Sequence, residues 1–313
     1  MRLVLFEGPG AGRGIRPGVW TDEGVVDISR ATDELTYHTP QELMQEIIDN
    51  FDTLKPEIQA LVARTLPLPV DILRLRPPLP RPGKMLCCIG NYWEHDQREP
   101  RNLNMFLKNP DAVIGPGDTI VLPEYTDPYA FQHEAELAIV IKGPAKNVKR
   151  ENWRRAVFGY TGMIDVSARA NARSTWRQGS WMGKSFDTFA PLGPAITTAD
   201  EIEDPNKLWV KFWNDGELRH DYVTDDMEHR VPELIEWATT IMTLNTGDTI
   251  SCGTNHEGLG ALQDGERCDF ELEKIGRMTV YVRDPLKRQW ERGVDMGENS
   301  TNPAARAARQ ASS

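Results

Sequence analysis

Residues 129–141 read YAFQHEAELAIVI, an apolar run that carries two glutamates, Glu134 and Glu136, close to its start. Side chains at alternate positions of a β-strand point to the same face, so a strand here sets the two carboxylates side by side. Neighbouring carboxylates repel each other, and burial removes the water that would stabilise their charge. The stretch therefore predicts a buried strand with something positive at its mouth, either a basic side chain or a cation.

The chain after residue 84 repeats this strand-like pattern. Short apolar runs bounded by turn residues are typical of strands, and they fall at residues 84–90, 111–123, 134–141, 153–164, 208–218, 248–254, 266–276 and 278–284. Residues 231–244 (VPELIEWATTIMTL) interrupt them with helical periodicity and a proline near the start. Many strands with few helices predict a mainly β fold of the α+β class, with a barrel-like or sandwich-like β domain.

A proline-rich segment divides the chain. Six prolines lie within residues 67–82, and such a run favours extended backbone and excludes helix. Before it, strand-like runs at residues 1–6 and 24–29 and helical periodicity over residues 39–66 indicate a separate small unit. We expect a small N-terminal domain with its linker over residues 1–80, a larger domain over residues 84–285 and a polar tail over residues 286–313.

Composition narrows the class of protein. The chain has 36 basic and 47 acidic residues in 313, a formal charge of −11, which argues against nucleic acid or an anionic membrane as the partner. Its four cysteines show no CxxC metal spacing, and the adjacent Cys87 and Cys88 suit a buried strand better than a disulfide framework. No stretch approaches the roughly 18 apolar residues that span a bilayer, and the N-terminal apolar run is too short for a signal peptide. We expect a soluble, cytoplasmic protein.

A third acid, Asp165, ends the strand-like run AVFGYTGMID, after which the sequence VSARANAR favours a helical turn. Together with Glu134 and Glu136 it offers three carboxylates, which suit Mg²⁺ or Mn²⁺ better than zinc. The alternative is that the two glutamates lie on a solvated strand face.

Two further side chains are candidates for catalysis. His95 lies in NYWEHDQREP with Glu99 four residues on, and on a short helix the two can share a proton and make the imidazole a better base. Lys184, in WMGKSFDTF, can stabilise an oxyanion or enolate. The alternatives are a surface-loop histidine and a solvated lysine.

These segments resemble the fumarylacetoacetate hydrolase family. Eight blocks match in family order over about residues 84–284: NYWEH, FLKNPDAVIGPGDTIVLP, HEAELAIVI, IDVSAR, GKSFDTFAPLGP, WNDGELRH, TLNTGDTISCGT and FELEKIG. The resemblance implies a mixed β-roll or barrel catalytic domain over residues 84–285. It also implies metal binding by Glu134, Glu136 and Asp165, substrate binding by Arg169 and Thr254, and catalysis by His95, Glu99 and Lys184.

The chain departs from the family pattern in its loops. The glutamate partner of the histidine usually lies three residues after it, where this chain has Arg98, with Glu99 one position later. Asn255 replaces the proline of the glycine-threonine-proline loop, and Ile164 and Ala170 are unusual around the third acid.

The resemblance implies a divalent-metal-dependent hydrolase that cleaves a C–C bond of a 2,4-dioxo acid, such as an acylpyruvate or fumarylpyruvate-like compound, through a metal-bound enolate. The implied cofactor is Mg²⁺ or Mn²⁺, with Ca²⁺ as a further candidate. Isomerisation or tautomerisation, hydration and decarboxylation of oxaloacetate are alternatives, and a non-catalytic binding module is a hypothesis of a different class. The expected partners are a small 2-oxo acid substrate, in aromatic catabolism, and a second copy of the chain in a homodimer, with no nucleic acid and no membrane.

Overall fold

The structure, a computed structural model, describes residues 1–9, 14–94, 99–124, 130–169 and 180–290. Its strands are β1 (Arg2–Glu7), β2 (Arg16–Thr21), β3 (Gly24–Asp27), β4 (Arg74–Arg76), β5 (Met85–Cys88), β6 (Met105–Lys108), β7 (Val113–Ile114), β8 (Thr119–Val121), β9 (Ala130–Gln132), β10 (Ala135–Ile141), β11 (Val157–Ile164), β12 (Ser167–Arg169), β13 (Ala190–Thr198), β14 (Trp209–Asn214), β15 (Glu217–Val223), β16 (Thr249–Ser251), β17 (Arg267–Leu272) and β18 (Gly276–Arg283). Its α-helices are α1 (Pro40–Asp49), α2 (Phe51–Arg64), α3 (Ser180–Lys184) and α4 (Val231–Ile241). Short 3-10 helices include η4 (Arg150–Ala156), η6 (Ala199–Glu201) and η8 (Thr224–Asp226).

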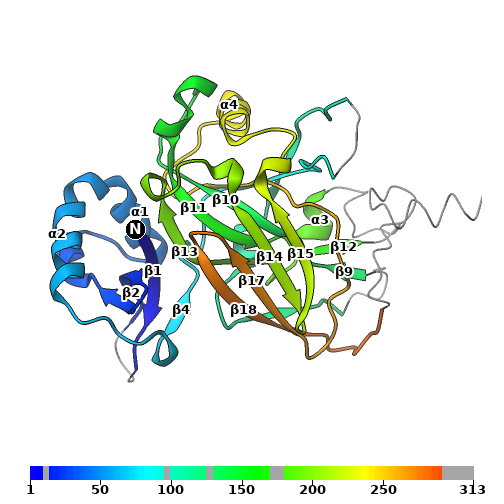
Figure 1. Cartoon of the computed structure of the whole chain (residues 1–313), viewed down its shortest axis with the longest axis horizontal. Helices are drawn as coiled ribbons and strands as arrows, with labels where there is room; N and C mark the ends of the chain where they lie inside the picture. Colours follow the sequence, from blue (N-terminus) through cyan, green and yellow to red (C-terminus); the bar gives the residue numbers. More distant parts are fainter. Residues whose placement is uncertain (10–13, 95–98, 125–129, 170–179, 291–313) are drawn as a thin grey trace, which may run out of the picture.

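Two sheets form the body of the molecule (Figure 1). An 11-stranded sheet runs in the order β3-β2-β1-β13-β11-β10-β16-β5-β6, with β4 and β7 attached to β1 and β13. A five-stranded sheet runs in the order β15-β14-β17-β18-β8. Within the described part of the chain both sheets are open, so the mainly β prediction is confirmed as a roll of sheets without a closed barrel.

Strand β10 contributes its two faces to two different cores. Leu137, Ile139 and Ile141 pack in the cluster shared with the five-stranded sheet. Ala138 and Val140 pack in the cluster that includes the apolar sides of α1 and α2. Every residue of β10 is buried, and complete burial of each large aliphatic side chain contributes roughly 1.5–3 kcal/mol. This strict alternation fixes the strand register, and it places Glu136 in phase with Ala138.

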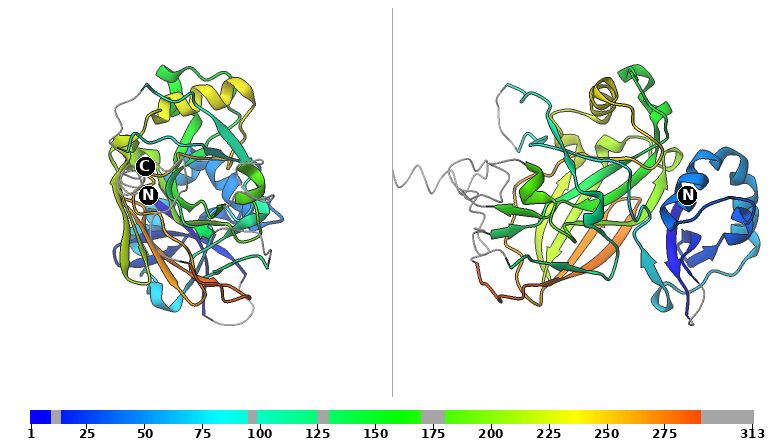
Figure 2. Two further views of the ribbon diagram at one scale, coloured as in Figure 1. Left: turned by 90° about the vertical axis from the view of Figure 1, so that its right-hand side faces the viewer. Right: turned by 180° about the vertical axis from the view of Figure 1, so that it is seen from behind.

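The N-terminal unit joins the rest of the chain through backbone pairing and ion pairs. Strand β1 pairs with β13 in the large sheet, and Lys55 of α2 lies 2.7 Å from Asp200 of η6. Figure 2 shows this unit at one end of the molecule, beside the larger part. The division at residue 80 stays a prediction, and the two parts share a sheet and a core.

Local signals explain the helices. Thr39 caps α1, its hydroxyl accepting a hydrogen bond from the Glu42 amide at 3.2 Å, and Asn50 then breaks the helical backbone. The periodicity predicted over residues 39–66 therefore forms two helices, α1 and α2, instead of one. The helical turn predicted after Asp165 is wrong over residues 167–169, which form β12 and pair with β9, and residues 170–173 of that stretch lie outside the described residues.

The structure also bears on the predictions about the cysteines, the C-terminal tail and membrane-spanning segments. All four cysteines are buried and free, which confirms that they form no disulfide framework. The first residues of the predicted tail are ordered against the body, with Trp290 packed edge-on against Phe131, and residues 291–313 lie outside the described residues. Among the described helices, none combines the length and apolar character needed to cross a membrane.

Candidate metal centre

Strand pairing brings the three predicted acids together. Glu134 immediately precedes β10, Glu136 lies on it, and Asp165 immediately follows β11. Because β10 and β11 are antiparallel, with Ala135 opposite Ile164, the end of β11 meets the start of β10. The Asp165 amide donates a hydrogen bond to the Glu134 carbonyl oxygen at 2.8 Å. Carboxylate oxygens of the three acids lie within 4.8 Å of one another, and all three side chains are buried.

Three cationic side chains surround this cluster. Nζ of Lys184, at the end of α3, lies 2.7 Å from both Glu134 Oε2 and Asp165 Oδ2. Nζ of Lys108, on β6, lies 2.7 Å from Asp165 Oδ1, and the Arg169 guanidinium pairs with Glu134 Oε1. Three carboxyl groups therefore face three cationic side chains, which compensate negative charge in this buried cluster.

Burial and the neighbouring charges shift the pKa values of these groups in different directions. Burial alone would raise the pKa of Glu134, but the charges of Lys184 and Arg169 outweigh it and lower that pKa far below its ordinary value. Burial and the charges of Asp165 and Glu134 raise the pKa of Glu136 well above its usual range. Burial would lower the pKa of Lys184, but Asp165 and Glu134 outweigh it and raise that pKa, so Lys184 is an ammonium at neutral pH.

One carboxylate oxygen shows that the cluster suits a cation. Glu136 Oε2 accepts hydrogen bonds from the Ser251 hydroxyl and from the Gly253 amide at 3.0 Å. Glu136 Oε1 is buried and has no hydrogen-bond partner among the described residues. An unpaired buried oxygen is costly, and here it belongs to a group of three converging carboxylates. Hard oxygen donors of this kind fit Mg²⁺, Mn²⁺ or Ca²⁺.

The remaining predicted site residues have mixed outcomes. Thr254 is buried next to Gly253, with Oγ1 3.5 Å from the Tyr222 hydroxyl, so its loop adjoins the acids. Glu99 is exposed at the start of a described segment. His95 lies outside the described residues, so its pairing with Glu99 stays a prediction. The substrate-binding roles of Arg169 and Thr254 also stay predictions.

Two elements of the site were not predicted from the sequence. Lys108 lies in the matched block FLKNP, and the signal was a lysine inside an apolar strand, where a fully buried ammonium requires a carboxylate. The second element is a pair of loops. The Glu94 carboxylate accepts hydrogen bonds from Nδ1 of His256 and, at 2.8 Å, from the His256 amide.

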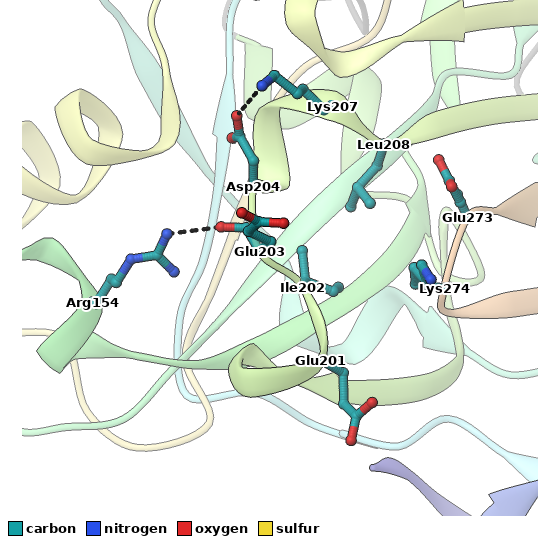
Figure 3. A pocket seen from close by; sticks show the side chains of 9 residues that line it. All are labelled: Arg154, Glu201, Ile202, Glu203, Asp204, Lys207, Leu208, Glu273 and Lys274. Carbon is teal, nitrogen blue, oxygen red and sulfur yellow. Dashed lines mark hydrogen bonds and ion pairs between the residues drawn. The ribbon is translucent and has the colours of Figure 1, made fainter.

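A large cavity lies elsewhere and is a separate feature (Figure 3). It has a volume of about 730 Å³ and is lined by Arg154, Glu201, Ile202, Glu203, Asp204, Lys207, Leu208, Glu273 and Lys274. Lys207 pairs with Asp204 at 3.4 Å, the Arg154 guanidinium donates a hydrogen bond to the Glu203 carbonyl oxygen at 2.8 Å, and none of the nine residues belongs to the acid cluster. A smaller hollow of about 370 Å³ is lined in part by Lys108 and Ser185. Lys108 pairs with Asp165, so this hollow adjoins the acid cluster.

Comparison with known proteins agrees with this geometry. Residues 85–283 match the family described as fumarylacetoacetate (FAA) hydrolase C-terminal. Maleylpyruvate hydrolase of Sphingobium sp. SYK-6, solved in complex with manganese(II) and pyruvate, is 34% identical with a TM-score of 0.79, over 91% of this chain and 99% of that one. Maleylpyruvate hydrolase of Aquipseudomonas alcaligenes is 32% identical over 86% of this chain and 96% of its own length. The mitochondrial oxaloacetate tautomerase FAHD2B of Bos taurus is 32% identical over 88% of this chain and 90% of its own length.

Proposed function

Because this chain belongs to the fumarylacetoacetate hydrolase family, we propose that it is a divalent-metal-dependent enzyme that hydrolyses a C–C bond of a 2,4-dioxo acid of the acylpyruvate type. The observation that carries the proposal is the buried cluster of three acids, in which Glu136 Oε1 has no hydrogen-bond partner within the described part of the chain. The similarity to two maleylpyruvate hydrolases over nearly the whole chain supports the reaction type.

The charge balance of the site supports an anionic substrate. Three carboxyl groups face three cations, so a divalent ion held by Glu134, Glu136 and Asp165 would leave about two positive charges in excess. A buried excess of positive charge attracts dianions, and 2,4-dioxo acids with a second carboxylate have that charge. When bound, Mg²⁺ or Mn²⁺ would supply Lewis acidity toward the oxygens of the 2-oxo acid.

The cationic side chains have distinct tasks in this proposal. Lys184 remains an ammonium because of its raised pKa, so it stabilises negative charge that develops on the departing enolate and does not act as a base. Arg169, whose side chain is 12% exposed, would bind the substrate carboxylate. Lys108 is fully buried against Asp165 and holds that acid in place.

A second reaction, tautomerisation of oxaloacetate, has its own support. The similarity to the oxaloacetate tautomerase covers 88% of this chain. Keto–enol exchange moves one proton and also passes through an anion, which the same cations would stabilise. Only the formation of two products from one substrate distinguishes hydrolysis from this reaction.

An absorbance assay with maleylpyruvate, fumarylpyruvate and oxaloacetate tests the proposal, with Mg²⁺ or Mn²⁺ and with a chelator. NMR of the products separates pyruvate release from tautomerisation. We expect metal-dependent pyruvate release by the wild type and by Glu203→Gln, which changes an acid in the remote cavity, and none by Glu136→Gln. Metal binding without turnover of any of the three substrates would contradict the proposal and favour a binding module. Light scattering on the same sample tests the proposed homodimer.

A further inference from the structure

Two loops that are distant in sequence form a histidine–carboxylate pair beside the metal centre. Glu94 ends the described segment that follows β5, and His256 lies in the loop after β16. Oε1 of Glu94 accepts hydrogen bonds from both Nδ1 and the backbone amide of His256. The Glu94 side chain is 1% exposed and the His256 side chain 15% exposed, so the carboxylate is enclosed while the imidazole is accessible.

We propose that His256, oriented by Glu94, is the general base that takes the proton from the attacking water. This inference rests on the hydrolytic function proposed above, and it assigns to His256 the task that the sequence analysis gave to His95 with Glu99.

The hydrogen bond determines which ring nitrogen can act. An ionised carboxylate only accepts hydrogen bonds, so the neutral imidazole of His256 carries its proton on Nδ1 and keeps a lone pair on Nε2. Nε2 has no hydrogen-bond partner in the described part of the chain. When Nε2 accepts a proton, the adjacent Glu94 carboxylate stabilises the imidazolium that forms. Glu94 is therefore a positioning residue, and His256 is the catalytic one.

The His256 loop is anchored to the metal centre. Gly253, three residues before the histidine, donates its amide to Glu136 Oε2 at 3.0 Å. The charge of His256 also contributes to lowering the pKa of Glu134, after burial, Lys184 and Arg169, so the imidazole lies within electrostatic range of the acids. A base on this loop therefore lies next to the place where the substrate would bind.

The backbone around Glu94 is held in an unusual conformation. Glu94 has a φ of 56°, in the left-handed region that non-glycine residues rarely adopt, and such strain is retained where surrounding contacts fix it. Asp226 of η8 supplies those contacts, because its Oδ2 accepts hydrogen bonds from the Glu94 amide at 3.1 Å and from Asn255 Nδ2 at 3.2 Å. One aspartate thus joins the two loops that carry the pair.

The proposed step balances without any further reactant. His256 Nε2 takes a proton from water as the water oxygen bonds to the distal carbonyl carbon, C4, of the 2,4-dioxo acid. The resulting alkoxide re-forms its carbonyl and breaks the C3–C4 bond, and that electron pair passes to C3 as the enolate of pyruvate. The proton on His256 then moves to C3, and the products are pyruvate and a carboxylic acid, which ionises.

Four variants test the proposal, each assayed for pyruvate release from the best substrate of the wild type. We expect His256→Ala to lower kcat by about 10²–10⁴-fold with KM changed only a few-fold, and added imidazole to restore part of kcat. Glu94→Gln keeps the shape of the side chain and removes its charge, so it should lower kcat with unchanged Mn²⁺ affinity. His38→Ala, an exposed histidine of the N-terminal unit, is the control and should match the wild type.

The fourth variant, His95→Ala, separates the two candidate bases. The inference would be overturned if His95→Ala lost turnover and regained part of it with added imidazole, while His256→Ala kept kcat within threefold of the wild type. That outcome would leave the proposed function intact. Absence of pyruvate release by the wild type itself would instead contradict the proposed function. Mn²⁺ titration shows whether each variant is folded. If His256→Ala does not fold, the kcat of Glu94→Gln tests whether the His256–Glu94 pair supplies the base.

Discussion

Nζ of Lys184 lies 2.7 Å from Oδ2 of Asp165, and the same ammonium is equally close to Glu134. The lysine therefore bridges two of the three acids that would hold the metal. A fixed positive charge beside a cation site weakens metal binding but stabilises any anion formed there. In the proposed mechanism Lys184 would therefore serve turnover at some cost to metal affinity.

This relationship predicts opposite effects on binding and turnover. Lys184→Met should bind Mn²⁺ at least as tightly as the wild type, because a competing charge is removed. It should lower kcat by about 10²–10³-fold, because the developing enolate loses its ammonium partner. Isothermal titration with Mn²⁺ and the pyruvate assay measure the two effects. Lys207→Met, at an exposed lysine of the remote cavity, is the matched control, and a loss of metal binding in Lys184→Met would contradict the assignment.

A second prediction concerns the buried lysine that the sequence analysis missed. Lys108→Met keeps an apolar stem of similar length but leaves Asp165 without one of its two cations. Removing one partner of a buried pair is strongly destabilising, so we expect the free energy of unfolding to fall by about 3 kcal/mol in urea titrations with chelator. Lys55→Met breaks the surface pair with Asp200, whose side chain is 49% exposed, and should cost less than about 1 kcal/mol. Equal effects of the two variants would show that burial of the Lys108 pair is unimportant.

A third prediction links metal binding to stability. At a concentration of 100 times the Kd, Mn²⁺ should raise the free energy of unfolding of the wild type by about 2.7 kcal/mol. Glu136→Gln should abolish this gain, because it removes the carboxylate whose Oε1 lacks a hydrogen-bond partner among the residues that the structure describes. The raised pKa of Glu136 favours its uncharged form in the metal-free protein, and an amide is uncharged too, so the metal-free variant should lose little stability relative to the wild type. Thermal unfolding with Mn²⁺ and with chelator checks both statements, and an unchanged Mn²⁺ shift in the variant would exclude Glu136 as a ligand.

The cluster of three acids could be predicted from the sequence because its geometry follows from two neighbouring strands. The period of two in a strand places Glu134 and Glu136 on one face, and Asp165 follows at the end of the next strand in the sheet. The Glu94–His256 pair could not be predicted, because the two residues are 162 positions apart and meet only through the packing of two loops. Strand periodicity carries no information about such a contact, whereas the resemblance located the loops but placed the base at His95.

The last prediction concerns a buried histidine pair, one member of which, His133, directly precedes Glu134 in the sequence. Nδ1 of His133 lies 3.0 Å from Nε2 of His220, and both side chains are fully buried. Burial lowers the pKa of His220 to about 4, and burial together with the His220 charge lowers the pKa of His133 well below its usual range. An unfolded histidine titrates near pH 6.5, so between about pH 6.5 and 4 the unfolded chain binds protons that the folded chain does not. Stability should therefore fall as the pH falls through this window, by up to about 1.4 kcal/mol per pH unit for each histidine.

Urea unfolding at pH 7, 6 and 5 measures the slope of the free energy of unfolding against pH. His220→Gln should flatten it, whereas the exposed-site variant His38→Gln should leave it unchanged, and a wild-type slope in His220→Gln would show that the buried pair does not control acid stability.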